Sequence, residues 1–396
     1  MPRRMLLLVS LGLFLGMTLW FSATAAAPSI VLEFAMGTSA RAWLTMAVQA
    51  GFVTGTLITA LTNAADVINP RRLFLIGALT AALVNAALAV ASTATMIVLL
   101  RLLTGAALAW VYPPAMKITS GWFRERRGAA LGVVIGALTI GSAFPHLVAW
   151  LGAGLPWRAL ICASSICAAV GALIVELAVR DGPYVAASAP FDRHALRMVL
   201  RNQGVRLATL GYLGHMWELY AAWTWIATFA AAALASHAAG FGSLVAFIMI
   251  ASGAVGCVAA GLWADVWGKP QIAGAAMVVS STCSLLSPIA FRVSFAGLLA
   301  FVAVWGFSVV ADSAQFSALV AEHSPPTHVG TALTLQVSAG FLLTMVSMRL
   351  VPELAAAFGW GWGFLILVPG PALGAWAMRE LSCQSPAASS QLSEKT

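Results

Sequence analysis

The stretch Gly261-Leu-Trp-Ala-Asp265-Val-Trp-Gly268-Lys269-Pro270 is a short charged turn between two long apolar runs. The run before it covers 240–262 and the run after it covers 271–291. About 20 apolar residues are enough to cross a bilayer as a helix, so this stretch predicts a membrane hairpin of two helices. Its charged residues then lie at the membrane surface.

Runs of the same length recur along the whole chain. Twelve can be placed, at 5–27, 43–62, 73–91, 96–118, 129–151, 158–179, 206–234, 240–262, 271–291, 296–320, 329–351 and 360–380. The composition agrees, since 61% of the 396 residues are hydrophobic and 9% are charged. A soluble domain carries roughly 25% charged residues. We therefore expect an all-α membrane protein with twelve transmembrane helices.

The first run begins like a secretory signal, with Arg3 and Arg4 before an apolar segment and small residues near Ala27. The apolar core of a signal is about 7–15 residues long, and this run is longer. We expect an uncleaved first helix.

The basic residues alternate between the connections. One set of connections holds almost all of them: Arg3, Arg4, Arg71, Arg72, Lys117, Arg124, Arg126, Arg127, Arg180, Arg193, Arg197, Arg201, Arg206, Lys269, Arg379 and Lys395. The other set holds Arg41, Arg158, Arg292 and Arg349. Lys and Arg are enriched in cytoplasmic connections, so we expect both termini in the cytoplasm and the chain in a cytoplasmic (inner) membrane.

Two parts of the chain repeat. Asp66-Val-Ile-Asn-Pro-Arg71-Arg72 follows the second run as Asp265 follows the eighth, 199 residues later. Gly128 and Gly330 also open similar segments, Arg-Gly-Ala-Ala-Leu and Val-Gly-Thr-Ala-Leu, 202 residues apart. A repeat of half the chain length in a membrane protein is typical of transporters with a central cavity between two related halves.

The predicted organisation is therefore two pseudo-symmetric six-helix bundles, 1–179 and 206–381, with a linker at 180–205 and a disordered cytoplasmic tail at 382–396. The linker carries Arg193, Arg197 and Arg201 at helical spacing between apolar residues. This spacing predicts a short amphipathic helix on the inner membrane surface.

Several other classes of protein are disfavoured. The net charge is +8, but the basic residues lie in short connections rather than on one basic face, so we expect no nucleic-acid partner. The five cysteines lack metal-site spacing, and we expect neither a metal nor a cofactor. No Walker A loop or paired acidic motif is found, so we expect neither direct ATP use nor an enzyme. The expected partners are a small solute and membrane lipid, with a functional monomer.

Ionisable and polar residues within the apolar runs are the candidate pathway for solute and protons. A charge at mid-bilayer costs at least about 2.5–3.5 kcal/mol, so such a residue usually has a function. The candidates are Arg101, Tyr112, His215, Glu218, Asp312 and Gln315. Three of these residues also have an alternative role: Glu218 pairs internally with His215 one turn away, Arg101 braces its own helix, and Asp312 serves as a gate residue.

The charged turns carry a resemblance to a known family. The loop after the second helix of major facilitator superfamily transporters reads Gly-x-x-x-Asp-Arg-x-Gly-Arg-Arg, and Gly261, Asp265, Gly268 and Lys269 match it closely. The first copy keeps Asp66, Arg71 and Arg72 but has Asn69 for the glycine and Val67 for the first arginine. Arg101 and Gly105 match a second signature, Arg-x-x-x-Gly. The resemblance implies a gating role for both loops.

The resemblance also implies an arrangement of the helices. In the family, helices one, four, seven and ten line the cavity, which places the candidate residues at the solute site. Helices two, five, eight and eleven meet between the halves. Segments such as Leu19-Trp-Phe-Ser22 and Gly214-His-Met-Trp-Glu-Leu-Tyr220 are similar to a bacterial branch filed with nitrate/nitrite or cyanate permeases. Nitrate carriers of the resembled family bind the anion with an arginine in helix two and another in helix eight. Neither 43–62 nor 240–262 contains Arg or Lys, so the resemblance disfavours nitrate itself.

The expected function is secondary active transport of a small anionic or zwitterionic solute by alternating access, coupled to protons. A carboxylate in a low-dielectric cavity can load and release a proton. A drug or metabolite efflux antiporter of the same fold is the main alternative, and an intramembrane enzyme or receptor is a distant one.

Overall fold

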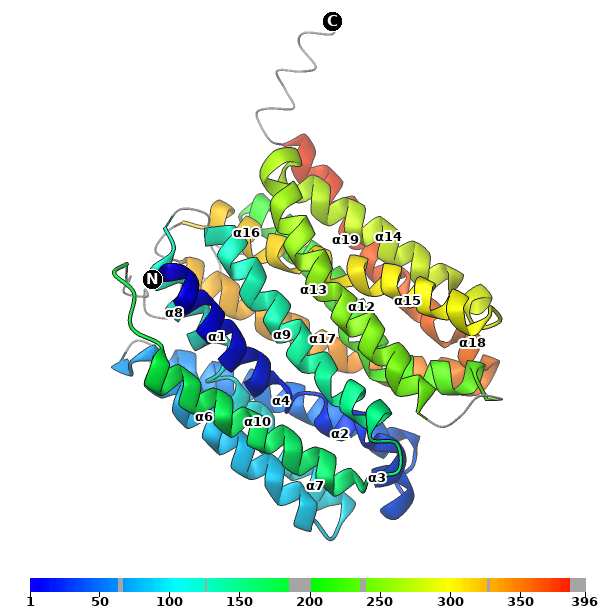
Figure 1. Ribbon diagram of the computed structural model, residues 1–396. Helices are drawn as coiled ribbons and strands as arrows, with labels where there is room; N and C mark the ends of the chain where they lie inside the picture. Colours follow the sequence, from blue (N-terminus) through cyan, green and yellow to red (C-terminus); the bar gives the residue numbers. More distant parts are fainter. Residues whose placement is uncertain (63–66, 125–126, 185–200, 236–239, 326–327, 385–396) are drawn as a thin grey trace, which may run out of the picture.

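We analysed a computed structural model of the protein, which describes residues 1–62, 67–124, 127–184, 201–235, 240–325 and 328–384. The described chain is helical, and its helices lie side by side in one elongated bundle (Figure 1). The long apolar runs explain this architecture, because backbone groups in lipid must be paired within the crossing segment itself.

The first six crossings are built from α1 (Pro2–Met17), α2 (Ser22–Ala25) and α3 (Ala27–Glu33); α4 (Thr38–Thr62); α6 (Pro70–Ala86) with η1 (Ala87–Val90); α7 (Ala94–Leu108) with α8 (Tyr112–Trp122); α9 (Arg127–Leu151); and α10 (Trp157–Ala178). The second six are α12 (Gln203–Ala233); α13 (Phe241–Trp267); α14 (Lys269–Ala290); α15 (Phe295–Ala311) with α16 (Ser313–His323); α17 (Val329–Phe358); and α18 (Trp360–Gly363), η2 (Phe364–Leu367) and α19 (Pro369–Cys383). The predicted twelve-helix fold is confirmed.

The two sets of six crossings form the N-terminal half and the C-terminal half. In Figure 1, α6, α7 and α10 lie on one side of the molecule, and α14, α15 and α18 lie on the other. The halves meet where α9 packs against α13 and α4 packs against α17. Small residues permit the first contact: a Cβ added at Gly136 of α9 would lie 3.5 Å from the carbonyl oxygen of Ala254 in α13.

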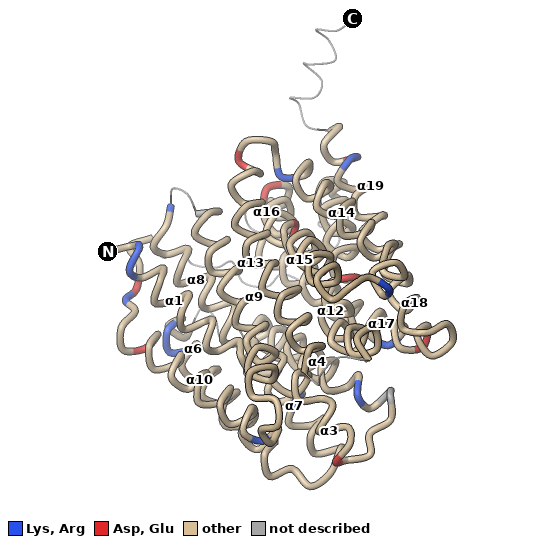
Figure 2. Tube along the Cα trace, turned by 45° about the vertical axis from the view of Figure 1, so that its right-hand side comes forward, with Lys and Arg blue, Asp and Glu red and all other residues tan. Residues whose placement is uncertain are grey.

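The bundle has two faces. Pro2 and Cys383 lie at one end of the bundle, which we call the terminal face, and the end of α3 and the start of α13 lie at the opposite end, the distal face (Figure 1). Charged residues concentrate near these two ends, and the middle of the bundle is almost free of them (Figure 2). This distribution is the one expected for a chain whose middle lies in lipid.

Ten crossings are long and apolar enough to span a membrane by length and composition among the described residues. The two others are the first crossing, which is broken into α1, α2 and α3, and the seventh, α12. α12 carries His215 and Glu218 among aromatic residues, which lowers its mean hydropathy. The first and seventh crossings occupy equivalent positions in the two halves.

Several crossings predicted as continuous are interrupted among the described residues, and three of the breaks lie near candidate residues. The first breaks between Met17 and Ser22, the fourth between Leu108 and Tyr112, and the tenth at Asp312. Pro113 and Pro114 lie in the first turn of α8, where their missing N–H groups cost no helical hydrogen bond. A broken helix leaves backbone groups unpaired at membrane depth, so other groups must pair with them.

Two predicted segments lie partly or wholly outside the described residues. Arg193 and Arg197 of the predicted amphipathic helix are outside them, whereas Arg201 is described and exposed. α19 continues to Cys383, past the predicted start of the tail at 382, and residues 385–396 are outside the described part.

Candidate functional site

Glu218 is the middle residue of α12 and is 1% exposed. Its Oε1 accepts hydrogen bonds from Ser284 Oγ of α14 at 2.7 Å and from Trp305 Nε1 of α15 at 2.8 Å. Both donors are neutral, and no Arg or Lys contacts the carboxyl group within the described chain. The structure therefore places a carboxyl group at mid-depth inside the C-terminal half, held by two neutral hydrogen bonds.

His215 pairs with Asp312 rather than with Glu218. The distance from His215 Nδ1 to Asp312 Oδ1 is 2.8 Å, and both side chains are almost completely buried. The geometry is that of an ion pair rather than a directed hydrogen bond, and the other ring nitrogen, Nε2, has no hydrogen-bond partner in the described residues. The predicted internal pair of His215 with Glu218 is thus replaced by a pair that joins α12 to the break between α15 and α16.

Two further candidates lie beside helix breaks. Tyr112 is the first residue of α8 and is half-buried, and Gln315 is buried in the first turn of α16. Both positions belong to the fourth and tenth crossings, which the family resemblance predicted to face the cavity.

Arg101 of α7 is fully buried and contacts the N-terminal half alone. Its guanidinium donates to the carbonyl oxygens of Leu44 and Leu19, each at 3.0 Å, and to that of Trp20. It also donates to Asn85 Oδ1 at 3.2 Å. Leu19 and Trp20 lie in the break of the first crossing, so Arg101 pairs with carbonyl groups at the break, of which that of Leu19 also accepts from Ser22. This arrangement favours the bracing role for Arg101.

Six aromatic side chains join the two halves at mid-depth, and we call them the aromatic seam. They are Trp20, Phe21 and Phe52 of the N-terminal half and Tyr220, Trp223 and Phe341 of the C-terminal half. Ring centroids lie 5.8 Å apart for Trp20 and Tyr220, and 5.0 Å apart for Phe52 and Phe341. All six side chains are buried. In this structure the seam closes the space between the halves.

Several polar atoms beside the seam have no hydrogen-bond partner in the described residues. They are Trp20 Nε1, Trp223 Nε1, Gln49 Nε2 and both ring nitrogens of His146. Gln49 uses its oxygen to accept a hydrogen bond from Thr344 Oγ1 across the halves. An unpaired buried polar group costs roughly 1–3 kcal/mol, and such groups in native proteins need an explanation. Most of these groups are N–H donors, so they suit a ligand with hydrogen-bond acceptors.

The sequence did not predict the seam. The signals available were Trp20 and Phe21 side by side before Ser22, and Gln49 as a lone amide within an apolar run. None of these positions is unusual until the fold brings them together.

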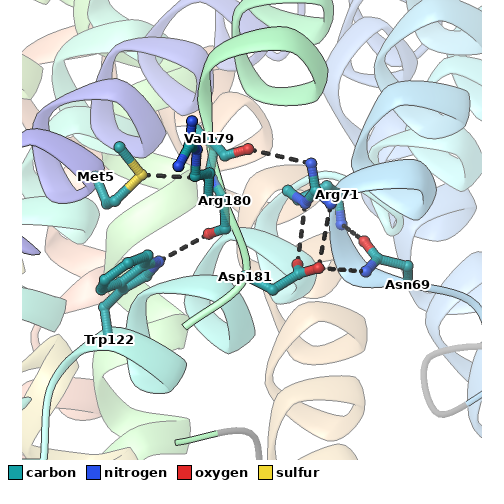
Figure 3. Close-up of polar contacts among 7 residues, drawn as sticks. All are labelled: Met5, Asn69, Arg71, Trp122, Val179, Arg180 and Asp181. Carbon is teal, nitrogen blue, oxygen red and sulfur yellow. Dashed lines mark hydrogen bonds and ion pairs between the residues drawn. The ribbon is translucent and has the colours of Figure 1, made fainter. Parts of the chain in front are cut away.

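The predicted gating residues lie on the terminal face. Arg71 donates from Nε to Asp181 Oδ1 at 2.9 Å, and Asn69 Nδ2 donates to Oδ2 at 3.0 Å (Figure 3). Arg71 also donates to the carbonyl oxygen of Val179 at 3.1 Å. The guanidinium and the Asn69 amide hold the pKa of Asp181 below its ordinary value. These contacts join the start of α6 to the chain after α10, within the N-terminal half.

The second copy of the motif has a corresponding ion pair. Lys269 Nζ lies 2.5 Å from Glu322 Oε1, which joins the start of α14 to the end of α16. Gly268, the N-cap of α14, has φ +91°, a conformation that favours glycine. Asp265 is exposed, Gly261 has open space around its Cα, and Arg72 is exposed. Asp66 lies outside the described residues.

Three comparisons with known proteins agree with this arrangement. The model of the Major Facilitator Superfamily matches residues 9–256. Monocarboxylate transporter 13 of Rattus norvegicus is 28% identical over 168 residues, a match that spans 38% of this chain and 39% of that protein's length.

Solved structures are similar over nearly the whole chain. The nucleoside transporter NupG superposes with a TM-score of 0.71 at 14% identity, covering 95% of this chain and 99% of that one. The human organic anion transporter MFSD10 superposes with a TM-score of 0.68 at 15% identity, with the same coverage. At these identities the likeness shows the fold.

Proposed function

The chain belongs to the Major Facilitator Superfamily of transporters, and on that premise we propose that it moves a small organic anion by alternating access, coupled to protons. The observation that supports this most is the pair of buried carboxyl groups in the C-terminal half. Neither Glu218 nor Asp312 is contacted by an Arg or Lys among the described residues. Ionisable groups at membrane depth are costly and are typically retained for proton or ion transfer.

The proton step uses groups of the C-terminal half. Burial favours the neutral form of Glu218, while its hydrogen bonds from Ser284 and Trp305 favour the charged form. A small rearrangement of either donor changes this balance and so moves a proton. His215 and Asp312 share a proton more directly, because their side chains are in contact.

The solute step uses the aromatic seam. The unpaired N–H groups of Trp20, Trp223 and Gln49 match the acceptor oxygens of a carboxylate, and the rings match a small carbon skeleton. The similarity to a monocarboxylate transporter and to an organic anion transporter supports this class of solute. The relatives named above do not support the nitrate/nitrite or cyanate permease branch, which stays a prediction.

Alternating access requires the seam to part, first toward one face and then toward the other. We assign Arg101 to bracing the broken first crossing rather than to the solute, because its donors are taken by carbonyl groups of its own half. The ion pairs of Arg71 and Lys269 brace each half on the terminal face, and Asp265 completes the proposed gate. We assign the terminal face to the cytoplasm, in an inner membrane.

Transport into proteoliposomes tests the proposal. Purified protein is reconstituted, an inward proton gradient is imposed, and uptake of radiolabelled acetate, lactate and pyruvate is followed. Uptake above that of protein-free vesicles, abolished by a protonophore, is the expected result. Uptake of all three acids that is indifferent to the gradient contradicts proton coupling, and no uptake of any contradicts the solute class.

The aromatic seam also suits a drug or metabolite efflux antiporter, because bulky apolar cargo binds to aromatic rings. Overexpression in a drug-sensitive strain separates the two functions. Raised resistance to several unrelated compounds, without monocarboxylate uptake, favours efflux.

A further inference from the structure

A cavity between the halves lies at the distal face, beyond the aromatic seam. Its volume is about 300 Å³. The N-terminal half contributes Thr24, Ala25, Ala27, Pro28, Arg41 and Leu44, and the C-terminal half contributes Thr224, Trp225, Ala227, Thr228, Ala231, Gly240, Gly242 and Ser243. Both halves therefore form its wall.

Arg41 is the cation of this cavity. It lies in the first turns of α4 and is half-buried. Nη2 donates to Thr228 Oγ1 at 2.6 Å, and the guanidinium carbon lies 5.4 Å from the ring centroid of Trp225. The other N–H groups of its guanidinium have no protein acceptor in the described part of the chain. Arg41 is thus held by Thr228 and Trp225, and its guanidinium keeps further N–H donors that a ligand can use.

The remaining lining also favours an anion. α13 begins at Phe241 after the N-cap Gly240, and no side chain caps this helix end. The N–H groups at the start of a helix carry partial positive charge, and Gly242 of this first turn lines the cavity, whereas the N–H of Ser243 already donates to the carbonyl oxygen of Gly240. Ser243 adds a hydroxyl group, whereas the hydroxyl groups of Thr24 and Thr224 are engaged with Thr45 and Met348. No Asp or Glu is among the described residues that line the cavity.

We propose that this cavity binds a small carboxylate anion, held by Arg41 and the start of α13. A planar guanidinium suits the two oxygens of a carboxylate. The volume equals that of roughly ten water molecules, which is more than a halide ion needs and enough for an acid of a few carbons. The site is separate from the aromatic seam and from Glu218, so it goes beyond the transport function proposed above.

Occupancy of this site has a consequence for the two halves. Arg41 belongs to the N-terminal half, and Thr228 and Ser243 belong to the C-terminal half. An anion that contacts both draws the distal ends together. Bound carboxylate therefore stabilises the form in which the distal face is closed.

Binding to purified protein tests the site without any transport step. Sodium acetate is titrated into detergent-solubilised protein at constant ionic strength, and heat and thermal unfolding are measured. Sodium chloride serves as the second probe. We expect saturable binding of acetate, at least about tenfold weaker in Arg41→Gln because one charge-assisted hydrogen bond is lost. Arg292→Gln, which removes another distal cation, is the matched control and keeps the acetate affinity of the unaltered protein.

Ala231→Leu narrows the cavity but leaves Arg41 in place, and it also weakens acetate binding. This variant keeps the test informative if Arg41→Gln does not fold. Equal acetate affinity in Arg41→Gln or in Ala231→Leu overturns the proposal, as does chloride binding as tight as acetate binding. Absence of saturable acetate binding in the unaltered protein overturns it too, even where the vesicles transport monocarboxylates. Binding at Arg41 without transport contradicts the proposed function instead.

Discussion

Replacing Glu218 by Gln tests the coupling site with little disturbance to the structure. Both hydrogen bonds to Glu218, from Ser284 and from Trp305, end on Oε1, and the amide oxygen of Gln can accept both. Gln cannot release a proton. If one proton accompanies each solute molecule, a pH step of one unit supplies about 1.4 kcal/mol, which corresponds to roughly tenfold accumulation. We expect accumulation to fall from about tenfold to none in Glu218→Gln.

The assay separates coupling from solute binding. Vesicles loaded with unlabelled solute exchange it for labelled solute without net proton movement, so exchange should persist in Glu218→Gln. Glu353→Gln, which removes an exposed carboxylate paired with Arg349, is the control and should accumulate solute normally. Tenfold accumulation by Glu218→Gln under the same pH step refutes the assignment, and Asp312→Asn is then the next variant. Glu218→Ala should instead lower stability by about 1–3 kcal/mol, because Trp305 Nε1 loses its acceptor.

Three further predictions concern bracing, the terminal face and topology. Arg101→Gln should destabilise the protein by about 1–3 kcal/mol, because the carbonyl oxygen of Trp20 loses its guanidinium donor, whereas that of Leu19 keeps its hydrogen bond from Ser22; thermal unfolding in detergent measures this, and a stable variant with weakened solute affinity would contradict the bracing role. The pKa of Asp181 is lowered in the folded protein, so the contribution of its contact with Arg71 is present at neutral pH and disappears as the pH falls through that lowered value. The difference in unfolding temperature between the unaltered protein and Asp181→Asn should therefore shrink on acidification. At this exposed site the contact contributes at most about 1 kcal/mol to the free energy of unfolding. A temperature difference that does not change with pH would rule out the contact. Reporter fusions after Ala187 and Ser390 should both indicate the cytoplasm, and a periplasmic signal from either would break the proposed orientation.

The sequence predicted the crossings well because lipid imposes a simple rule on length and composition. It could not predict the breaks at Met17, Leu108 and Asp312, since an interrupted run is as apolar as a continuous one. The sequence also favoured pairs between residues one helix turn apart over pairs between residues of different crossings. His215 and Glu218 are one turn apart, yet each finds its partner on another crossing, Asp312 and Trp305 respectively.

Arg101 shows a second limit of prediction from the sequence. Its depth in the membrane was evident from the sequence, but its acceptors are backbone carbonyl groups, which every residue has. Sequence patterns carry no record of which carbonyl groups a break leaves free. Arg41 was assigned to the outer set of basic residues as a topology signal, and only the three-dimensional arrangement shows its cavity.

The aromatic seam has a thermal consequence. The ring contacts at the seam join the halves largely through apolar surface, without an ion pair among those rings, so parting them replaces ring–ring contact mainly with ring–water contact. Exposure of apolar surface to water raises the heat capacity, and the hydrophobic contribution weakens on cooling. The closed arrangement is therefore held less firmly in the cold, and the rate of passage should follow a curved rather than a straight Arrhenius plot.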